Sequence, residues 1–185
     1  MNSILIGNGK SILGRSLGSK IDDFDNVIRL NNFKIKGFED DLGKKTTIHA
    51  RRCCDDVENT EGINVVGFIT YCTISNGMRI VSDTLRENYG SKYEEVSLRR
   101  CMEIHDKIGL EYPEERASVG VLAVEFFWRK FGVLSITGFD LLYDKNVKKM
   151  EKYWGDKPVD SNYHNFWKEA RYIKGLVSLG VVNIV

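Results

Sequence analysis

Short apolar runs alternate along this chain with polar segments that contain glycine. The runs that predict strands are residues 4–6, 27–31, 46–50, 64–70, 133–137 and 181–185. The segments in which apolar residues recur at helical spacing are residues 76–88, 99–109, 119–131 and 164–179. Strands that alternate with helices favour an α/β fold, with a largely parallel sheet flanked by helices.

The first fifty residues carry the clearest local pattern. The apolar run at residues 4–6 ends in the turn Gly7-Asn8-Gly9, and amphipathic residues at positions 12–21 lead into the strand at 27–31. This order predicts a β-α-β unit with a helix between its strands. A glycine turn after such a strand exposes backbone N–H groups, which is where α/β proteins bind phosphate groups.

Two nucleotide-binding signatures can be excluded at this turn. A P-loop needs a glycine five residues before Gly9-Lys10-Ser11, and that position is Ile4. The dinucleotide fingerprint needs a third glycine at position 12, which is Ile12. The turn alone therefore leaves open whether it binds a ligand or is only a tight turn.

A second informative block begins at Ser118. Its hydroxyl can cap the apolar helix that follows, and Gly120 lies in the first turn of that helix. The next strand ends at Gly138-Phe139-Asp140, which we expect at the carboxyl edge of the sheet, where ligands bind.

The aromatic and histidine positions near the end of the chain are ambiguous when taken alone. Tyr153 and Trp154 by themselves indicate core or lid packing rather than a substrate platform. His164 and Glu169 are five residues apart, so on a helix they lie about 140° apart and do not face each other.

The composition is that of one globular domain. The chain has 185 residues, 42% of them hydrophobic, and its 27 basic and 26 acidic residues give a net charge of +1. We therefore predict a single domain over residues 1–185. The near-neutral charge weighs against nucleic acid as a partner, and nothing in the composition indicates an oligomeric state.

The cysteines and the hydropathy pattern suggest an intracellular setting. Cys53, Cys54, Cys72 and Cys101 form no C-x-x-C pair and no short zinc-binding spacing with histidine. The chain shows no secretory signal and no apolar run of about 18 residues that could span a bilayer. We expect a reduced, cytoplasmic protein with no transmembrane segment and no bound metal.

Order and spacing together give a more specific indication. The segment from Gly7-Asn8 through Arg29-x-Asn31 to Lys45-Thr46-Thr47 resembles, over about forty positions, the large sialylmotif of the animal-type sialyltransferases. The other three motifs of that family are resembled, in family order, by Ser118-x-Gly120 with Gly138-Phe139, by Lys152-Tyr153-Trp154 and by His164-x4-Glu169. The chain is identified as a short, soluble microbial or viral member of this sialyltransferase-like family.

The resemblance implies a Rossmann-like fold, a variant similar to GT-A, and an inverting transferase that needs neither a metal nor a cofactor besides its CMP-sugar donor. It implies that His164 is the general base, since a histidine can accept the acceptor's proton at neutral pH. The residues predicted to bind the donor nucleotide are Gly7, Asn8, Gly9, Asn31, Ser118, Gly120, Gly138, Phe139, Tyr153 and Trp154. Its phosphate is expected to be held by the glycine turn and by the helix start at Ser118.

Two departures from the family pattern are visible. Ser3 and Phe131 stand where the family has the cysteines of a disulfide, which agrees with a reduced protein. Lys152 replaces the histidine of the short aromatic motif. We predict that Lys152 has a catalytic role, with Lys152 or the nearby Lys148 or Lys149 supplying positive charge to the leaving phosphate.

The resulting prediction is transfer of an acidic sugar, sialic acid or a Kdo-like sugar, from a CMP-sugar to a hydroxyl of a glycan or glycolipid acceptor. One alternative keeps the fold and the base but uses another nucleotide-sugar donor and a non-glycan acceptor such as modified nucleic acid. A second alternative is a degenerate member that binds nucleotides without transfer, which Lys152 favours. The sugar, the acceptor and the linkage are not determined by the sequence.

Overall fold

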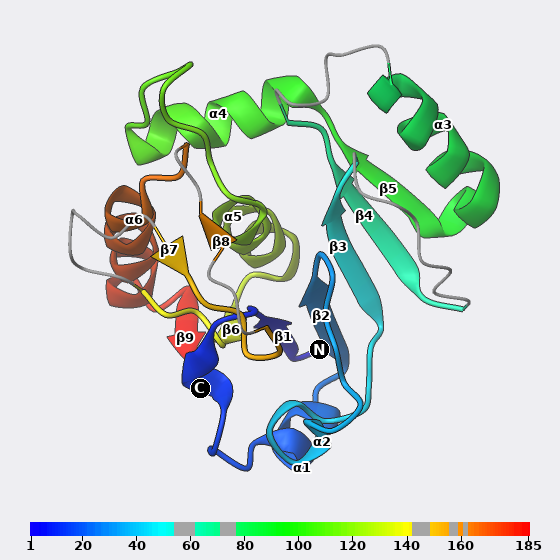
Figure 1. Cartoon of the computed structure of the whole chain (residues 1–185), viewed down its shortest axis with the longest axis vertical. Coiled ribbons are helices and arrows are strands. Elements are labelled where there is room, and N and C mark those ends of the chain that lie inside the picture. Colours follow the sequence, from blue (N-terminus) through cyan, green and yellow to red (C-terminus); the bar gives the residue numbers. More distant parts are fainter. Residues whose placement is uncertain (54–61, 71–76, 142–148, 156–158, 161–162) are drawn as a thin grey trace.

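The computed structural model describes residues 1–53, 62–70, 77–141, 149–155, 159–160 and 163–185. Its main feature is a seven-stranded sheet in the order β5-β4-β3-β2-β1-β6-β9, in which every pairing is parallel (Figure 1). The strands are β1 (Ser3–Ile6), β2 (Asn26–Leu30), β3 (Ile48–Arg52), β4 (Asn64–Phe68), β5 (Tyr93–Val96), β6 (Leu134–Thr137) and β9 (Val182–Ile184). Strand order runs outward from β1 in both directions, so the topological switch point lies between β1 and β6.

Helices pack on both faces of this sheet. They are α1 (Gly18–Asp22), α2 (Glu39–Leu42), α3 (Gly77–Tyr89), α4 (Leu98–Ile108), α5 (Val119–Phe131) and α6 (Phe166–Ser178), with 3₁₀ turns η1 (Lys10–Ile12) and η3 (Gly90–Lys92). A separate antiparallel pair joins β7 (Lys149–Met150) to β8 (Val159–Asp160). Figure 1 shows α5 near the middle of the molecule, with α4 and α6 close to it and α3 at the β4–β5 end. Within the described part of the chain, no helix has the length and apolar composition needed to cross a bilayer.

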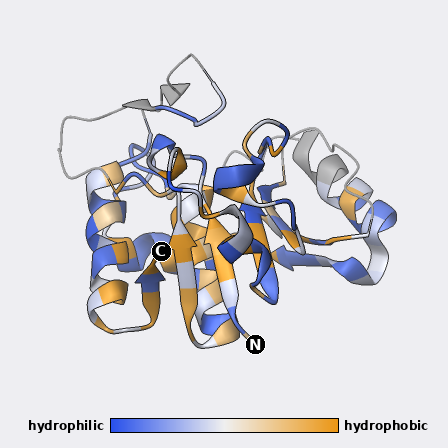
Figure 2. Ribbon diagram, turned by 90° about the horizontal axis from the view of Figure 1, so that it is seen from below, coloured by the Kyte–Doolittle hydropathy of each residue, from blue (hydrophilic) through white to orange (hydrophobic). Residues whose placement is uncertain are grey.

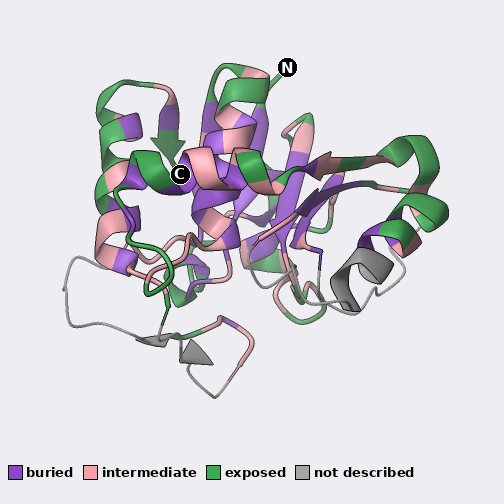
Figure 3. Ribbon diagram, turned by 90° about the horizontal axis from the view of Figure 1, so that it is seen from above, coloured by how far each residue is buried: buried purple, intermediate pink, exposed green. Residues whose placement is uncertain are grey.

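The core follows the two-residue alternation of the strands. Leu5 and Ile28 point to the face covered by α5 and belong to the larger hydrophobic cluster. Ile4 and Ile6 point to the other face, where they pack with residues that include Ile12 from η1. Figure 2 shows the central strands as the most hydrophobic part of the ribbon, and Figure 3 shows them as buried.

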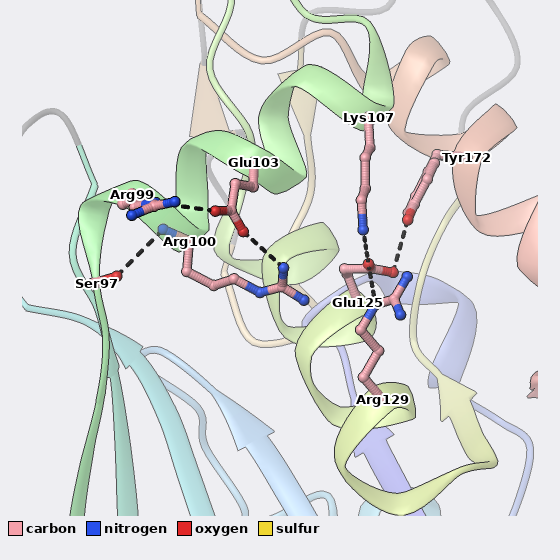
Figure 4. Close-up of polar contacts among 8 residues, drawn as sticks. All are labelled: Ser97, Arg99, Arg100, Glu103, Lys107, Glu125, Arg129 and Tyr172. Carbon is pink, nitrogen blue, oxygen red and sulfur yellow. Dashed lines mark hydrogen bonds and ion pairs between the residues drawn. The ribbon is translucent and has the colours of Figure 1, made fainter.

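A buried carboxylate joins the three helices that cover one face. Glu125 on α5 is fully buried, and its carboxylate accepts hydrogen bonds from Lys107 Nζ on α4 (3.0 Å) and Tyr172 OH on α6 (2.7 Å). It also accepts from Arg129 Nε (2.6 Å) and Trp128 Nε1 (2.5 Å) on its own helix. Figure 4 shows Lys107, Arg129 and Tyr172 converging on Glu125. This cluster fixes α5 and α6, whose N-terminal ends form the site described below.

The predicted α/β class and the Rossmann-like parallel sheet are confirmed. The β-α-β unit expected at the start of the chain is present, since β1 and β2 are parallel and α1 lies between them, but this helix is shorter than the amphipathic positions 12–21 suggest. Gly14 and Ser16 have φ of 73° and 51°, which no α-helix allows, and their N–H groups donate to the carboxylate of Asp41 at 2.8 and 2.7 Å.

Two other differences concern strands. The strand expected at residues 46–50 is observed at Ile48–Arg52, and β5 was not predicted. Two of the four residues of β5 are glutamates and only Val96 is buried, as suits a strand at the edge of the sheet. Cys54, Cys72 and Lys148 lie outside the described residues, and the side chain of Lys149 is not described.

Candidate active site

A cavity of about 600 Å³ lies at the carboxyl edge of the sheet. Its wall combines the ends of β1, β2 and β6 with the N-terminal end of α5 and the residues that lead into α6. The sequence-predicted residues that line it are Gly7, Asn8, Asn31, Ser118, Gly120, Gly138, Phe139, Lys152 and His164. The structure therefore brings together positions from all four motifs at the switch point, where ligands bind in α/β folds.

Glycine at position 7 is required by the close approach of two strand ends. A Cβ atom on Gly7 would lie 2.3 Å from the carbonyl oxygen of Gly138, which itself has φ of 69°. The backbone N–H of Gly7 donates to Thr137 O and that of Gly9 donates to Gly138 O, both at 2.8 Å. The turn therefore joins β1 to the end of β6.

Several N–H groups at this turn have acceptors within the protein. The N–H of Ser11 donates to Asp140 Oδ1 at 3.0 Å, in addition to the bonds made by the N–H groups of Gly7 and Gly9. Phosphate binding by the turn stays a prediction, and it would have to use other atoms than these three N–H groups. Donor contacts by other atoms of Gly7 and Gly9 stay predictions.

The two asparagines bind the protein's own backbone as well as facing the cavity. Asn8 Nδ2 donates to Leu30 O (3.0 Å) and Asn32 O (3.2 Å), so a ligand contact of this amide would use Oδ1, which only accepts. Asn31 has φ of 47°, and its Oδ1 accepts from the N–H of Arg52 at 3.3 Å. Both side chains hold the edges of β1, β2 and β3 in position.

The N-terminus of α5 is the best candidate for binding an anion. Ser118 is the N-cap, and its Oγ accepts from Val121 N at 3.3 Å. The next two residues, Val119 and Gly120, line the cavity, and their N–H groups have no acceptor within the helix. An anion there also gains from the helix dipole. Phe139 packs against Gly120, since a Cβ at Gly120 would lie 3.4 Å from its ring.

Glu169 holds α6 against this helix end. The carboxylate is buried and accepts from both groups of Ser118, the backbone N–H at 2.8 Å and Oγ at 2.6 Å. Burial raises the pKa of Glu169, although a protonated His164 and the bonds from Ser118 act in the opposite direction. Glu169 therefore bonds to Ser118, and no hydrogen bond between Glu169 and His164 is found among the described residues.

His164 lies just before α6, which is capped by Asn165 and not by His164 itself. Its Nδ1 lies 2.7 Å from the carbonyl oxygen of Arg116. A carbonyl oxygen can only accept, so Nδ1 carries the hydrogen and Nε2 carries the lone pair of the neutral ring. This is the arrangement in which Nε2 can take a proton.

The short aromatic motif has one residue at the cavity and one in the core. Lys152 lines the cavity, and its Nζ lies 4.6 Å from the centroid of the Trp154 ring. Tyr153 is buried against the β1 face, and its hydroxyl bonds to both backbone groups of Lys34. Trp154 packs at the edge of the same core. Donor contacts by Tyr153 and Trp154 stay predictions, since the structure shows a packing role for both.

Sequence reasoning missed several residues of the cavity wall. Arg52 is the last residue of β3, and Arg116 stands two residues before the N-cap of α5. The guanidinium of Arg116 stacks on the ring of Tyr163 at 4.4 Å. Arg52 comes shortly after the strand expected at residues 46–50, and this position could have placed it at the carboxyl edge of the sheet. The wall on the α4 side is made by Leu98, Cys101, Met102 and His105.

Two further expectations can be compared with the described residues. No group of three His, Cys, Asp or Glu side chains among them is arranged to hold a metal ion. Cys53 and Cys101 are buried free thiols, and burial raises the pKa of Cys101 to about 12. Ser3 is buried in β1, where its Oγ accepts from Asn26 Nδ2 at 3.0 Å.

The fold and the cavity define a Rossmann-like α/β protein with a cavity at the switch point of its sheet. Residues 2–59 match glycosyltransferase family 29 (sialyltransferase). The chain is 49% identical to the CMP-N-acetylneuraminate-beta-galactosamide-alpha-2,3-sialyltransferase 4 of Mus musculus over 207 aligned residues, which cover 97% of this chain and 62% of the relative. It is 58% identical over 45 residues to the CMP-N-acetylneuraminate-beta-1,4-galactoside alpha-2,3-sialyltransferase of Rattus norvegicus, covering 24% of this chain and 12% of the relative.

Solved structures agree with this family resemblance. A mammalian sialyltransferase superimposes with a TM-score of 0.75 at 19% identity, covering 100% of this chain and 68% of the other. A mammalian sialyltransferase in complex with Gal-beta-1-3GalNAc-ortho-nitrophenol gives a TM-score of 0.72 at 17% identity, with the same coverage. The predicted resemblance to the sialyltransferases is therefore confirmed, and the chain spans about three fifths of the length of the mouse relative.

Proposed function

We propose that this chain is an inverting glycosyltransferase that moves an acidic sugar from a CMP-sugar to a glycan hydroxyl, with His164 as the general base. The observation that carries the proposal is the bond from His164 Nδ1 to Arg116 O at the edge of the cavity. This bond holds the imidazole with Nε2 as its proton acceptor, which is what an acceptor hydroxyl requires.

The cavity suits an anionic donor. Phosphate binding is supported by the N-terminal end of α5, where Val119 and Gly120 line the cavity and a helix start favours an anion. Lys152, Arg52 and Arg116 add positive charge to the same wall. The relatives' names specify CMP-N-acetylneuraminate and a galactoside or a galactosamide, which supports a CMP-activated sialic acid or a similar sugar acid as donor here.

The proposed chemistry uses these positions. The bond between the anomeric carbon and the CMP phosphate breaks as the acceptor oxygen attacks from the opposite face, which inverts the anomeric centre. The acceptor's proton passes to His164 Nε2, and the phosphate leaves with the bonding electron pair. Charge that develops on the leaving phosphate is stabilised by the α5 N-terminus and by the ammonium of Lys152. We propose that the reaction needs no metal ion.

The test is a thermal-shift panel followed by turnover. CMP, UMP, GMP and AMP are added to wild type and to His164→Ala. At about 100 times its dissociation constant, a ligand stabilises by about 2.7 kcal/mol, or about 5–10 °C for a chain of this size. We expect a shift with CMP in both proteins and transfer from CMP-sugars by wild type only.

Other outcomes separate the alternatives. A shift with a different nucleotide moves the donor assignment to that nucleotide and reopens the acceptor, including modified nucleic acid. A CMP shift without any transfer favours the non-catalytic alternative, for which Lys152 in place of the family's histidine is the specific reason. Transfer by His164→Ala at the wild-type rate would refute the role of the base.

A further inference from the structure

The segment that leads from α4 to α5 lies directly against the residues that carry the proposed base. We refer to residues 109–118 as the α4–α5 connection. Arg116 N donates to Tyr163 O at 2.6 Å, and His164 Nδ1 donates to Arg116 O at 2.7 Å. Both backbone groups of Arg116 are therefore used to hold residues 163–164. The position of the imidazole depends on the position of this one peptide segment.

Glu115 is the residue that fixes this connection. Its backbone N–H donates to Glu111 O at 2.7 Å, and its carbonyl oxygen bonds to His105 Nε2 on α4 at 3.0 Å. Its Oε1 accepts from Asn165 Nδ2 at 2.6 Å. Its Oε2 accepts from Lys168 Nζ at 2.7 Å and from the N–H of Glu111 at 3.0 Å. One residue thus ties α4, the connection and the start of α6 together.

The charge of Glu115 is matched to this role. Burial by itself would raise the pKa of this carboxyl, but the hydrogen bonds from Asn165 and Lys168 lower it overall. Glu115 is therefore ionised at neutral pH, and both of its oxygens are acceptors. The side chains of Glu115 and Lys168 are each 22% exposed, so the pair is partly shielded from water.

Glu115 lies one residue from the carbonyl that orients the base, and Asn165 lies one residue from the base itself. The bond between the side chains of Glu115 and Asn165 and the bond between Arg116 O and His164 Nδ1 therefore join the same two segments, the α4–α5 connection and the start of α6. We propose that Glu115 is a positioning residue, which holds Arg116 O against His164 and so fixes the imidazole in the form that accepts a proton at Nε2. This inference rests on the proposed role of His164 and extends it to a residue outside the sequence motifs.

The matched control is Glu111, in the same connection. Its carboxylate lies 3.4 Å from the same Lys168 ammonium, but its side chain is 82% exposed and no bond to Asn165 is seen among the described residues. Glu115→Gln and Glu111→Gln remove the same charge near the same cation. Only the first weakens the link to the base.

The first readout is the tautomer of His164, from ¹⁵N NMR of protein with labelled histidine. The chain has three histidines, and His164→Gln identifies the signals of residue 164. We expect the Nδ1–H form in wild type and in Glu111→Gln, and a mixture with the Nε2–H form in Glu115→Gln and Glu115→Ala. The second readout is turnover, in which the Glu115 variants should lose about 10-fold to 100-fold in kcat with the donor KM unchanged.

The outcomes separate this inference from the proposed function. If wild type shows no transfer with any CMP-sugar, the proposed function fails, and the tautomer measurement still decides whether Glu115 positions His164. An unchanged tautomer and an unchanged pH profile of kcat/KM in Glu115→Gln would overturn the inference. If Glu115→Ala does not fold, Glu115→Gln and Asn165→Ala give the same comparison, with the same results expected. Equal effects in the Glu111 and Glu115 variants would also overturn it.

Discussion

Replacing Ser118 by alanine removes one oxygen atom that makes two contacts. Ser118 Oγ caps α5 by accepting from Val121 N at 3.3 Å, and it donates to the buried carboxylate of Glu169 at 2.6 Å. Ser97 provides a matched comparison, since its Oγ caps α4 by accepting from Arg100 N at the same 3.3 Å but is exposed (Figure 4). The difference between the two variants therefore measures the contact with Glu169.

The magnitude follows from these two contacts. Loss of a serine N-cap costs about 1 kcal/mol, and loss of a hydrogen bond to a charged group costs about 1.5–3 kcal/mol. Ser97→Ala should therefore cost about 1 kcal/mol, and Ser118→Ala about 2.5–4 kcal/mol. For a chain of this length the larger loss corresponds to a fall in Tm of about 5–15 °C.

Chemical denaturation of the two variants beside wild type provides the assay, and CMP-induced thermal shifts provide the functional readout. Ser118→Ala should also weaken the CMP shift, because the helix end that faces the cavity loses its fixed position, whereas Ser97→Ala should leave that shift unchanged. Equal losses of stability in the two serine variants would refute the reasoning, since they would mean that the Ser118–Glu169 contact contributes nothing to folding.

Four further results are expected. Gly7→Ala should lower the free energy of unfolding by about 1–3 kcal/mol and abolish the CMP shift, because the new Cβ would lie 2.3 Å from a backbone carbonyl oxygen. The control is Gly175→Ala on α6, which has open space around it and should stabilise the fold by about 0.5–1 kcal/mol. Glu125→Ala should cost about 3–5 kcal/mol in urea unfolding, because it leaves the donors around a buried carboxylate without their acceptor. Lys152→Ala should lower kcat with CMP binding intact. Folding raises the pKa of Glu169, so in wild type this group stabilises the fold most at pH values below its pKa in the unfolded state. That contribution is lost as the pH rises through its pKa in the folded state. In Glu169→Gln this part of the pH dependence of stability should disappear.

Each of these expectations has a result that would contradict it. A Gly7→Ala protein with wild-type stability would show that the two strand ends can separate without cost. Glu125→Ala with an unchanged urea midpoint would show that the donors find water instead. Turnover unaffected by Lys152→Ala would remove this lysine from the mechanism. A Glu169→Gln variant with the same pH–stability curve as wild type would show that Glu169 titrates alike in both states.

The parts of the fold that sequence predicted well are those in which local pattern and burial agree. The helix at Val119–Phe131 has a serine cap and a continuous apolar run, and the structure gives it the predicted bounds. The strands β1 and β6 are buried at every or nearly every position, as parallel strands covered on both faces are. Edge strand β5 was missed because its two glutamates give no apolar run.

The parts that sequence did not predict depend on contacts between distant residues. The helix expected after β1 is shortened to α1, because the segment before it is held by Asp41, more than twenty residues away, through the N–H groups of Gly14 and Ser16. The propensities of residues 12–21 carry no information about that carboxylate. Glu115 was missed for a related reason, since its importance comes from Asn165 and Lys168, fifty and more residues further along the chain.

The glycine turn shows most clearly how far a motif can be interpreted without coordinates. A Gly-Asn-Gly turn after a buried strand is compatible with phosphate binding and with close packing of two strand ends, because both require a residue without a side chain. Here the N–H groups of Gly7 and Gly9 donate to backbone carbonyls beside β6, so packing accounts for these glycines. The N-terminus of α5, which lines the same cavity, is the proposed site for an anion. The turn therefore contributes to the site by placing β1 against β6.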